Sequence, residues 1–285
     1  MGSTAMRGAK EGAKKLLRAC GLDVRRAKRP ESPAPVQEPR ATLGGFLNHA
    51  KRLGLKPETI FDVGVAHGTP ELYAAFPTAC HVLIEPLEEY APHIREATAA
   101  LSTVHLITAA AGPEPGERVL HVHPDLVGSS FFLEDEDSDV NGVPRAVKVV
   151  TVDQTCADLH AAGPYLLKAD VQGAELDVLS GSRQTLKATE CVILEVCLFE
   201  FYRGGALLPD LVAFLDCEGF AVYDIFGPLY RPLDGAMSQV DVAFVKKNGA
   251  LRKHHVYATR AQRAQQTAKL HAPGGPDARG NRDQA

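Results

Sequence analysis

The chain has 285 residues, of which 45% are hydrophobic, 23% charged and 6% aromatic. This is the composition of a globular protein, and it excludes a collagen-like, a fully disordered and a disulfide-scaffold protein. Residues 1–40 hold ten Lys and Arg against four Asp and Glu, residues 250–285 hold seven against two, and residues 41–249 hold 14 against 29. An acidic body therefore carries two basic tails, and such a body is a poor general nucleic-acid binder because it repels phosphates.

The tails and the body predict three regions. Residues 1–40 are basic and rich in proline, and we expect a disordered extension there. Residues 250–285 are expected to form a second basic, disordered tail, and residues 41–249 the folded domain. The six cysteines show no zinc-ligand spacing, so we expect no metal. No apolar run reaches the roughly 18 residues of a membrane span, and no signal-peptide core begins the chain. These features favour a reduced, cytoplasmic protein without a membrane span.

Short apolar runs alternate with helical patterns along residues 41–249. Strand–helix alternation predicts an α/β fold in which a doubly wound, mostly parallel sheet has helices on both faces. The last two strands follow each other without a clear helix between them, which predicts an antiparallel pair at one edge. The expected helices cover 43–53 (with Thr42 as N-cap), 71–76, 88–101, 153–160, 174–187 and 208–217. The expected strands cover 59–63, 81–84, 104–110, 118–123, 146–150, 165–169, 191–196, 220–225 and 239–246.

Ligands of doubly wound sheets bind beyond the carboxyl ends of the strands. The first predicted strand ends in Asp62 and Gly64, and its turn closes at Gly68. Glycines here permit close approach of the backbone to a ligand and a tight entry into the next helix. The second strand ends in Glu85. A carboxylate at this place accepts two hydrogen bonds from a ribose diol and repels a ribose 2′-phosphate.

Two more strand ends complete the predicted crevice. The third strand ends in small residues that include Ala110, which leave room for a flat base. The fourth strand ends at Asp170, whose carboxyl would face the crevice beside the first glycine loop. The apolar run 191–196 contains one acid, Glu195, which is costly to bury unless it is paired.

A glycine turn followed by an acid fits two adenosine cofactors, a nicotinamide dinucleotide and S-adenosylmethionine. The dinucleotide fingerprint G-x-G-x-x-G uses its middle glycine to approach a pyrophosphate. Here Gly64 and Gly68 stand without that middle glycine. S-adenosylmethionine has no phosphate, and its cationic sulfonium suits an acidic crevice. The residues therefore favour the methyl donor, and a nicotinamide dehydrogenase is the disfavoured alternative.

The stretch 60–245 resembles the FkbM-type family of S-adenosylmethionine-dependent methyltransferases. Its strongest match is 165–179, YLLKADVQGAELDVL, which is close to the family signature K-x-D-x-[QE]-G-x-E-x-x-V-L. Where the family's glycine loop commonly reads D-x-G-A-N-x-G, Ala66 replaces the Asn. The resemblance implies a class I (Rossmann-like) fold with a seven-stranded sheet, and O-methylation of hydroxyls of small molecules, sugars or glycans. Supporting matches are Asp62-Val63-Gly64, Glu85-Pro86, Ser129-Ser130, Ile193–Val196 and Gln239-Val240-Asp241.

Fold position and resemblance together assign roles to the strand-end residues. Asp62, Gly64 and Gly68 are expected at the methionine end of the donor, Glu85 at the ribose and Ala110 at the adenine.

The catalytic candidates are Asp170 and Glu195. Asp170 has three roles open: deprotonating the acceptor, holding the donor's amino group, or binding a metal. Glu195 is either part of a structural ion pair, for example with Lys168, or an acid that faces the acceptor. The expected partner is a small-molecule or saccharide acceptor. A nucleic-acid methyltransferase that uses the basic tails, and a non-catalytic binding module on the same fold, are the alternatives; the sequence gives no oligomeric state.

Overall fold

The computed structural model describes residues 40–134 and 139–271. The N-terminal extension expected over 1–40 therefore lies outside the described residues, except for Arg40. The described part contains two units, one that ends at His255 and one that begins at Val256. In the second unit, Arg260–Leu270 form helix α9, where the expectation was a disordered tail. No residue of α9 is buried, and a capping box between Thr259 and Gln262 begins the helix.

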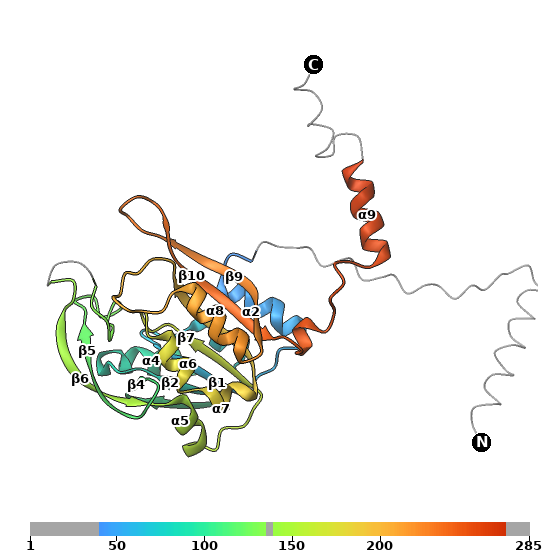
Figure 1. Cartoon of the computed structure of the whole chain (residues 1–285). Coiled ribbons are helices and arrows are strands. Elements are labelled where there is room, and N and C mark those ends of the chain that lie inside the picture. The colour runs from blue at the N-terminus through green and yellow to red at the C-terminus, as the bar shows by residue number, and fades with distance from the viewer. Residues whose placement is uncertain (1–39, 135–138, 272–285) are drawn as a thin grey trace, which may run out of the picture. The chain divides into compact units, whose positions relative to one another are not determined.

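A seven-stranded sheet, in the order β3–β2–β1–β7–β8–β10–β9, forms the centre of the first unit (Figure 1). Strands β3, β2, β1, β7 and β8 pair in parallel, and β10 is antiparallel to both β8 and β9. The doubly wound, mostly parallel fold with an antiparallel pair at one edge is therefore confirmed. The strands are β1 (Thr59–Val63), β2 (Cys80–Ile84), β3 (Thr103–Ile107), β7 (Tyr165–Ala169), β8 (Thr189–Cys197), β9 (Phe220–Tyr230) and β10 (Met237–Lys246).

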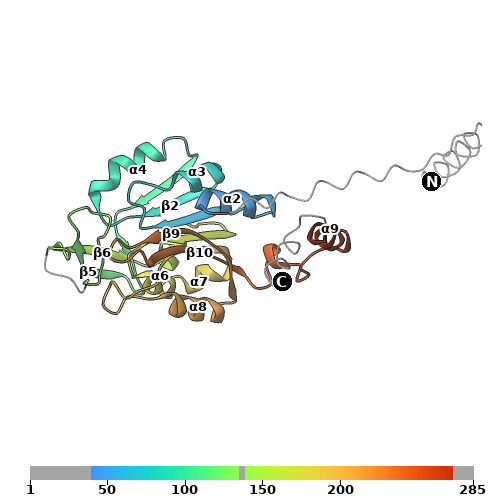
Figure 2. The same cartoon turned by 90° about the horizontal axis from the view of Figure 1, so that it is seen from above.

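Helices cover both faces of this sheet (Figure 2). On one face lie α2 (Leu43–Arg52), α3 (Pro70–Ala75), the 3₁₀ turn η1 (Glu88–Tyr90) and α4 (Ala91–Ala97). On the other lie α5 (Val152–Asp158), α6 (Glu175–Ser180), α7 (Arg183–Lys187) and α8 (Leu208–Cys217). Alternate residues of each strand point to opposite faces, so that Ile60 and Phe61 enter two separate hydrophobic cores. The 3₁₀ turn η2 (Ala250–Arg252) follows β10.

Three elements differ from the expected ones. The predicted helix 174–187 is divided into α6 and α7 at Gly181, where a Cβ would lie 2.1 Å from the carbonyl oxygen of Gly112. That close backbone contact requires glycine and interrupts the helix. The helix expected over 88–101 shortens to η1 and α4. The strand expected over 104–110 ends at Ile107, and Ala110–Ala111 (β4) belongs to a second sheet.

The second sheet has three strands in the order β4–β6–β5, with β5 at Gly116–Val122 and β6 at Val143–Val150. Two side-chain contacts fasten this insertion to the segment after β7. Ser130 Oγ donates a hydrogen bond to the carbonyl oxygen of Gln172 at 2.7 Å, and Arg118 pairs with Asp177 of α6 at 2.7 Å. The Arg118 guanidinium also lies 4.0 Å from the centre of the Phe131 ring. The insertion is thus held over the carboxyl ends of the central strands.

Across residues 40–134 and 139–271, no helix combines the length and the apolar character needed to cross a lipid bilayer.

Candidate functional site

A cavity that is partly open to solvent lies at the carboxyl ends of β1, β2 and β7. Four of the predicted site residues line it together: Gly64, Glu85, Ala110 and Asp170. They come from three strand ends and from β4, far apart in the sequence. This is the place where strand order reverses from β1 towards β7, and ligands of doubly wound sheets bind at such a point.

Gly64 allows two strand ends to touch. Its φ is +73°, and a Cβ at this position would lie 1.8 Å from the carbonyl oxygen of Asp170. The Gly64 N–H donates to the carbonyl oxygen of Ile84 at 2.9 Å, which also ties the loop to β2. A side chain here would push apart the two loops that carry the cavity wall.

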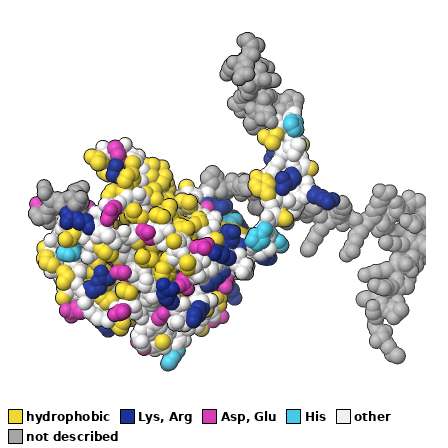
Figure 3. Space-filling model, viewed as in Figure 1, with side chains coloured by type: hydrophobic (Ala, Val, Ile, Leu, Met, Phe, Trp, Pro, Cys, Tyr) yellow, Lys and Arg dark blue, Asp and Glu magenta, His cyan; other side chains and the backbone are white. Residues whose placement is uncertain are grey.

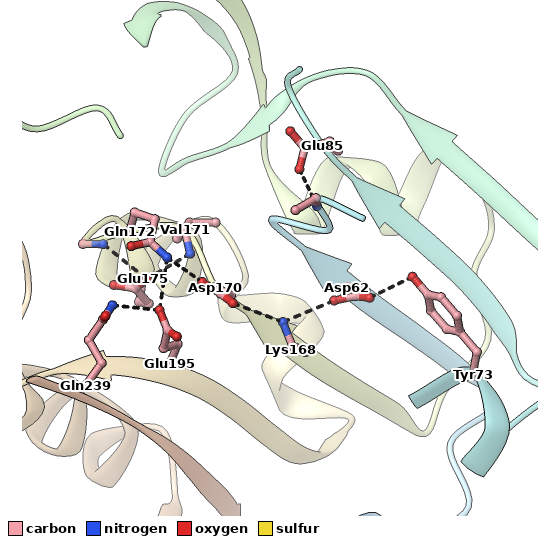
Figure 4. Close-up of polar contacts among 12 residues, drawn as sticks. Asp62, Tyr73, Glu85, Lys168, Asp170, Val171, Gln172, Glu175, Glu195 and Gln239 are labelled. Carbon is pink, nitrogen blue, oxygen red and sulfur yellow. Dashed lines mark hydrogen bonds and ion pairs between the residues drawn. The ribbon is translucent and has the colours of Figure 1, made fainter. Parts of the chain in front are cut away.

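The Glu85 carboxylate is held against the glycine loop (Figure 4). Its Oε2 accepts from the Ala66 N–H and its Oε1 from the Leu87 N–H, both at 2.9 Å. Burial raises the pKa of Glu85, and these backbone hydrogen bonds oppose the rise. The Val65 N–H also acts on this carboxylate. A carboxylate has about four acceptor positions, so Glu85 keeps the capacity to accept from a ligand hydroxyl.

Ala66 adopts a left-handed backbone conformation with φ of 46°. Asn is enriched in this region, and Ala is not. An Asn at this position would therefore suit the backbone conformation, and in this chain the Ala66 N–H donates to Glu85.

A buried cation lies between two acids behind the cavity wall. Lys168 Nζ is 3.8 Å from Asp62 Oδ1 and 3.8 Å from Asp170 Oδ2 (Figure 4). Burial would lower the pKa of Lys168, but the neighbouring acids outweigh it and raise that pKa. Asp62 is fully buried, accepts from the Tyr73 hydroxyl at 3.3 Å, and its Oδ1 has no hydrogen-bond partner.

Asp62 and Gly68 are not among the residues that line the cavity. Asp62 lies behind Asp170, with Lys168 between them. A Cβ on Gly68, whose φ is +106°, would lie 3.0 Å from the Ala97 Cβ, so this glycine serves the packing of the loop on α4. Asp62 can therefore affect a ligand in the cavity through Lys168 and Asp170.

Amide groups organise the carboxyls of Asp170 and Glu195 (Figure 4). Gln172 Nε2 donates to Asp170 Oδ1 at 2.9 Å and to Glu195 Oε2 at 3.1 Å. Gln239 Nε2 donates to the same Glu195 oxygen at 2.8 Å. The Tyr202 hydroxyl donates to Gln172 Oε1 at 2.8 Å, which fixes the direction of that amide. Glu195 is thus held by two amides, whereas Lys168 pairs with the two aspartates.

This cluster contains a carboxyl that titrates near neutral pH. Burial, followed by the charge of Asp170, raises the pKa of Glu195 to about 8. Burial also raises the pKa of Asp241, on the neighbouring strand β10, to about 6, although Lys168 opposes the rise. A carboxyl with a pKa near the working pH is suited to proton transfer.

Glu175 fixes the loop that carries Asp170. Its Oε1 accepts from the Val171 N–H at 3.0 Å and the Gly173 N–H at 3.4 Å, and its buried Oε2 has no hydrogen-bond partner. Burial raises the pKa of Glu175 to about 7. These contacts hold the backbone of the loop between β7 and α6 in place.

The raised pKa of Glu175 predicts a pH-dependent stability. Between pH 4.5 and pH 7 the folded protein holds a proton on this group that the unfolded chain releases, so its contribution to stability falls as the pH rises. The variant Glu175→Gln, which cannot ionise, is expected to gain about 1–3 kcal/mol in the free energy of unfolding relative to wild type between pH 5 and pH 8. Urea unfolding of both proteins at each pH measures this. A difference in the free energy of unfolding between the two proteins that stays the same from pH 5 to pH 8 would contradict this prediction.

Sequence reasoning missed several residues of the site. The cavity wall includes an apolar set from η1 and the insertion, and Tyr90 and Phe131 are its aromatic members. Tyr202 and Gln239 reach the acid cluster from outside the signature segment. Gln239 belongs to a short block that matches the family, and this match could have identified it as a site residue. No sequence pattern identifies Tyr202.

Comparison with known proteins gives the family. The model of the methyltransferase FkbM domain matches residues 62–222, which is more than half of the chain. The curated protein "2-O-methyltransferase NoeI" of Sinorhizobium fredii (strain NBRC 101917 / NGR234) is 25% identical over 185 residues, covering 59% of this chain and 75% of that protein.

Two solved methyltransferase structures also resemble the chain. Magnesium protoporphyrin IX methyltransferase (ChlM) from Synechocystis PCC 6803, with bound SAM, has a TM-score of 0.40 and 11% identity, covering 86% of this chain and 85% of that chain. Precorrin-6y C5,15-methyltransferase from Geobacter metallireducens GS-15 has a TM-score of 0.40 and 12% identity, covering 75% of this chain and 92% of that chain.

The strand order and the cavity at the β1–β7 reversal define a class I methyltransferase fold. The chain belongs to the FkbM methyltransferase family. It is an S-adenosylmethionine-dependent methyltransferase, and S-adenosylmethionine is its cofactor.

The residues of the cavity fit this cofactor. The buried Glu85 carboxylate is an acceptor suited to a ribose diol. The side chains of Ala110, Tyr90 and Phe131 offer apolar surface to a flat base. Asp170 brings negative charge to the end of the cavity near Gly64, which suits a sulfonium and an amino group.

Among the described residues, no three His, Cys, Asp or Glu side chains are placed to hold a metal ion. That no metal takes part stays a prediction, and full activity in EDTA would agree with it.

Proposed function

We propose that this methyltransferase transfers its methyl group to a hydroxyl oxygen of a small molecule, sugar or glycan. The single observation that carries the proposal is the acid pair of Asp170 and Glu195, with Asp170 on the cavity wall and the pKa of Glu195 near 8. A neutral hydroxyl must lose a proton during transfer, and a base of this pKa accepts it near neutral pH. The similarity to NoeI, whose name describes a 2-O-methyltransferase, supports an oxygen acceptor.

The cofactor supplies a methyl carbon activated by a positive sulfur. An acceptor oxygen would displace the neutral thioether from that carbon, and the carboxylate of Glu195 takes up the proton that the oxygen loses. Gln172 and Gln239 hold that carboxylate by its Oε2. Asp170 brings a carboxyl group to the cationic end of the donor, which favours binding of the sulfonium and the amino group. The products are a methyl ether and a neutral thioether.

The remaining roles follow the placement of each group. Glu85 accepts hydrogen bonds from the ribose, and Ala110 contacts the adenine. The backbone of Gly64 and the carboxylate of Asp170 hold the methionine end. Asp62 acts indirectly, because Lys168 lies between it and Asp170.

The role of Glu85 predicts a large loss of cofactor affinity in Glu85→Ala. The change removes both the proposed ribose contact and the acceptor of the Ala66 N–H. Charge-assisted hydrogen bonds contribute about 1.5–3 kcal/mol each, so affinity for S-adenosylhomocysteine is expected to fall about 10–100-fold. Isothermal titration measures this. Glu88→Ala, a change on the adjacent turn η1, is the matched control and should bind as wild type does. Equal affinity of Glu85→Ala and wild type would reject the ribose role.

An acceptor series on one scaffold tests the oxygen preference. Methyl β-D-glucopyranoside and its 2-amino and 2-thio analogues are incubated with protein and S-adenosylmethionine labelled in the methyl group. We expect label in the hydroxyl compound, and we expect the amount of label transferred to fall when Glu195 is replaced. Transfer to the amine or thiol but not to the hydroxyl would overturn the proposal.

Two further expectations belong to this proposal. Nucleic acid is not the acceptor, since residues 41–249 are strongly acidic; retardation of RNA or DNA by the protein at low salt would contradict this. A reducing, cytoplasmic location agrees with the free thiols of Cys80, Cys156, Cys191, Cys197 and Cys217.

A further inference from the structure

A hydroxyl group without a partner lies on the wall of the cavity at the ends of β1, β2 and β7, which we call the donor cavity. It belongs to Tyr90, which is 3% exposed and lines this cavity. Its Oη is buried and has no hydrogen-bond partner among the described residues. In the same part of the chain, the other buried polar atoms without a partner belong to Asp62, His81, Glu175 and Arg252, none of which lines the cavity. An unpaired buried hydroxyl costs free energy, so it requires an explanation.

The backbone fixes Tyr90 beside Glu85. The Leu87 N–H donates to Glu85 Oε1 at 2.9 Å, and the Tyr90 N–H donates to the Leu87 carbonyl oxygen at 3.1 Å. The rings of His67 and Tyr90 pack in a T-shape, with their centres 4.9 Å apart and an angle of 74° between their planes. Contacts of the backbone and of the ring therefore restrict where the hydroxyl can point.

The Tyr90 hydroxyl and the Glu85 carboxyl lie near each other without a hydrogen bond between them. Burial, followed by the charge of Glu85, raises the pKa of Tyr90 to about 12, so the phenol keeps its proton and can donate a hydrogen bond. An ionised carboxylate only accepts. The two side chains therefore offer a donor and an acceptor to the same part of the cavity, which both residues line.

A ribose diol carries the complementary groups. Each of its hydroxyls can donate one hydrogen bond and accept others. When such a hydroxyl donates to Glu85, its oxygen still has a lone pair for the phenol of Tyr90. The ring nitrogens of adenine are acceptors as well, and the experiment must separate them from the ribose oxygens.

We propose that Tyr90 is a further residue that binds S-adenosylmethionine: its hydroxyl donates a hydrogen bond to the oxygen of the ribose hydroxyl that donates to Glu85. This inference rests on the placement of the donor in this cavity, which belongs to the proposed function. A ligand without that hydroxyl would leave both side chains unpaired, so the pair makes the site selective for ribose.

Isothermal titration of the full chain with S-adenosylhomocysteine and with its 2′-deoxy, 3′-deoxy and 3-deaza analogues tests this contact. Tyr90→Phe removes the hydroxyl and keeps the ring. We expect its affinity for S-adenosylhomocysteine to be about 3–10-fold lower than that of wild type, the usual effect of losing one neutral hydrogen bond. With the deoxy analogue that lacks the partner oxygen, the two proteins should bind equally. With the 3-deaza analogue the difference between them should remain.

Thermal unfolding gives a second readout. Removing an unpaired buried hydroxyl breaks no hydrogen bond, so without ligand Tyr90→Phe should unfold at the wild-type temperature or above it. With S-adenosylhomocysteine at one concentration, its melting temperature should rise less than that of wild type, because the ligand binds it more weakly. A hydroxyl that served only the packing of η1 would not produce this ligand-dependent difference.

Tyr230→Phe is the matched control. Tyr230 ends β9, is 60% exposed and does not line the donor cavity. Figure 3 shows hydrophobic side chains gathered over the hairpin β9–β10, so this variant also removes a hydroxyl from apolar surroundings. It should bind each of the four ligands as wild type does.

Three results would overturn the inference. Equal affinity of Tyr90→Phe and wild type for S-adenosylhomocysteine rejects the contact; if Glu85→Ala loses affinity in the same experiment, the placement of the donor stands. A difference that persists with both deoxy analogues rejects the ribose oxygen, and its loss with the 3-deaza analogue would assign the hydroxyl to an adenine nitrogen. If neither Glu85→Ala nor Tyr90→Phe changes the affinity, the placement of the donor fails, and this inference fails with it.

Discussion

Replacing Glu195 by glutamine is expected to lower kcat for methyl transfer about 10²–10⁴-fold, the usual contribution of a general base. Affinity for S-adenosylhomocysteine should stay within about twofold, because Glu195 does not line the donor cavity. Glutamine preserves the size of the side chain and an oxygen that can accept from Gln239. The change therefore removes proton acceptance and preserves the shape of the acid cluster.

The pH dependence gives a second signature of the same group. The pKa of Glu195 is raised to about 8, so below that pH most molecules carry the protonated, inactive carboxyl. In wild type, kcat/KM is expected to rise about tenfold per pH unit up to about pH 8 and then level off. In Glu195→Gln this rise should disappear.

A matched control exists on the same strand. Glu190 lies at the other end of β8 and does not line the cavity at the strand ends, so Glu190→Gln should retain wild-type kcat and pH profile. A Glu195→Gln enzyme that keeps more than a tenth of the wild-type kcat and still gains rate with pH would assign the proton to another group, with Asp170 next in reach.

The second large effect is expected for Gly64→Ala. The added Cβ would lie 1.8 Å from the carbonyl oxygen of Asp170, and the position has a φ of +73°. Strain in the left-handed region and a backbone collision together should lower the free energy of unfolding by about 2–5 kcal/mol. The loops around the donor cavity must separate, so cofactor affinity should fall as well. Urea unfolding and isothermal titration measure the two losses.

Gly219→Ala separates strain from collision. Gly219 has a φ of +81°, and a Cβ there would meet nothing within 4 Å. Its substitution should cost about 1–2 kcal/mol and leave cofactor binding intact. If both alanine variants lose the same stability and bind cofactor equally well, the contact between the loops of β1 and β7 is not what requires glycine at position 64.

The central strands were predictable because their ends are marked locally. The runs at 59–63 and 165–169 are mostly apolar and lie between glycine or proline and a polar residue, and β1 and β7 begin and end there. Strand order then follows from the rules of doubly wound sheets. The same topology explains why Gly64, Glu85 and Asp170 lie around one cavity.

Contacts between distant segments were not predictable in this way. Gly181 interrupts the helix expected over 174–187 because its backbone contacts Gly112. The sequence around either glycine contains no pattern that predicts this contact. Asp62 shares the strand end with Gly64, yet its side chain turns towards Lys168 and Tyr73 and lies behind the cavity wall. Tyr202 reaches the acid cluster from a loop whose path depends on the whole sheet.

The left-handed alanine at position 66 makes the chain a candidate for stabilisation by design. Glycine relaxes such a backbone without moving it, and the hydrogen bond that this loop makes to Glu85 comes from the main-chain N–H of residue 66, which glycine retains. An engineer who wants a more heat-resistant catalyst can begin with this exchange, because Ala66 lines the cavity and glycine adds no side-chain atoms to it.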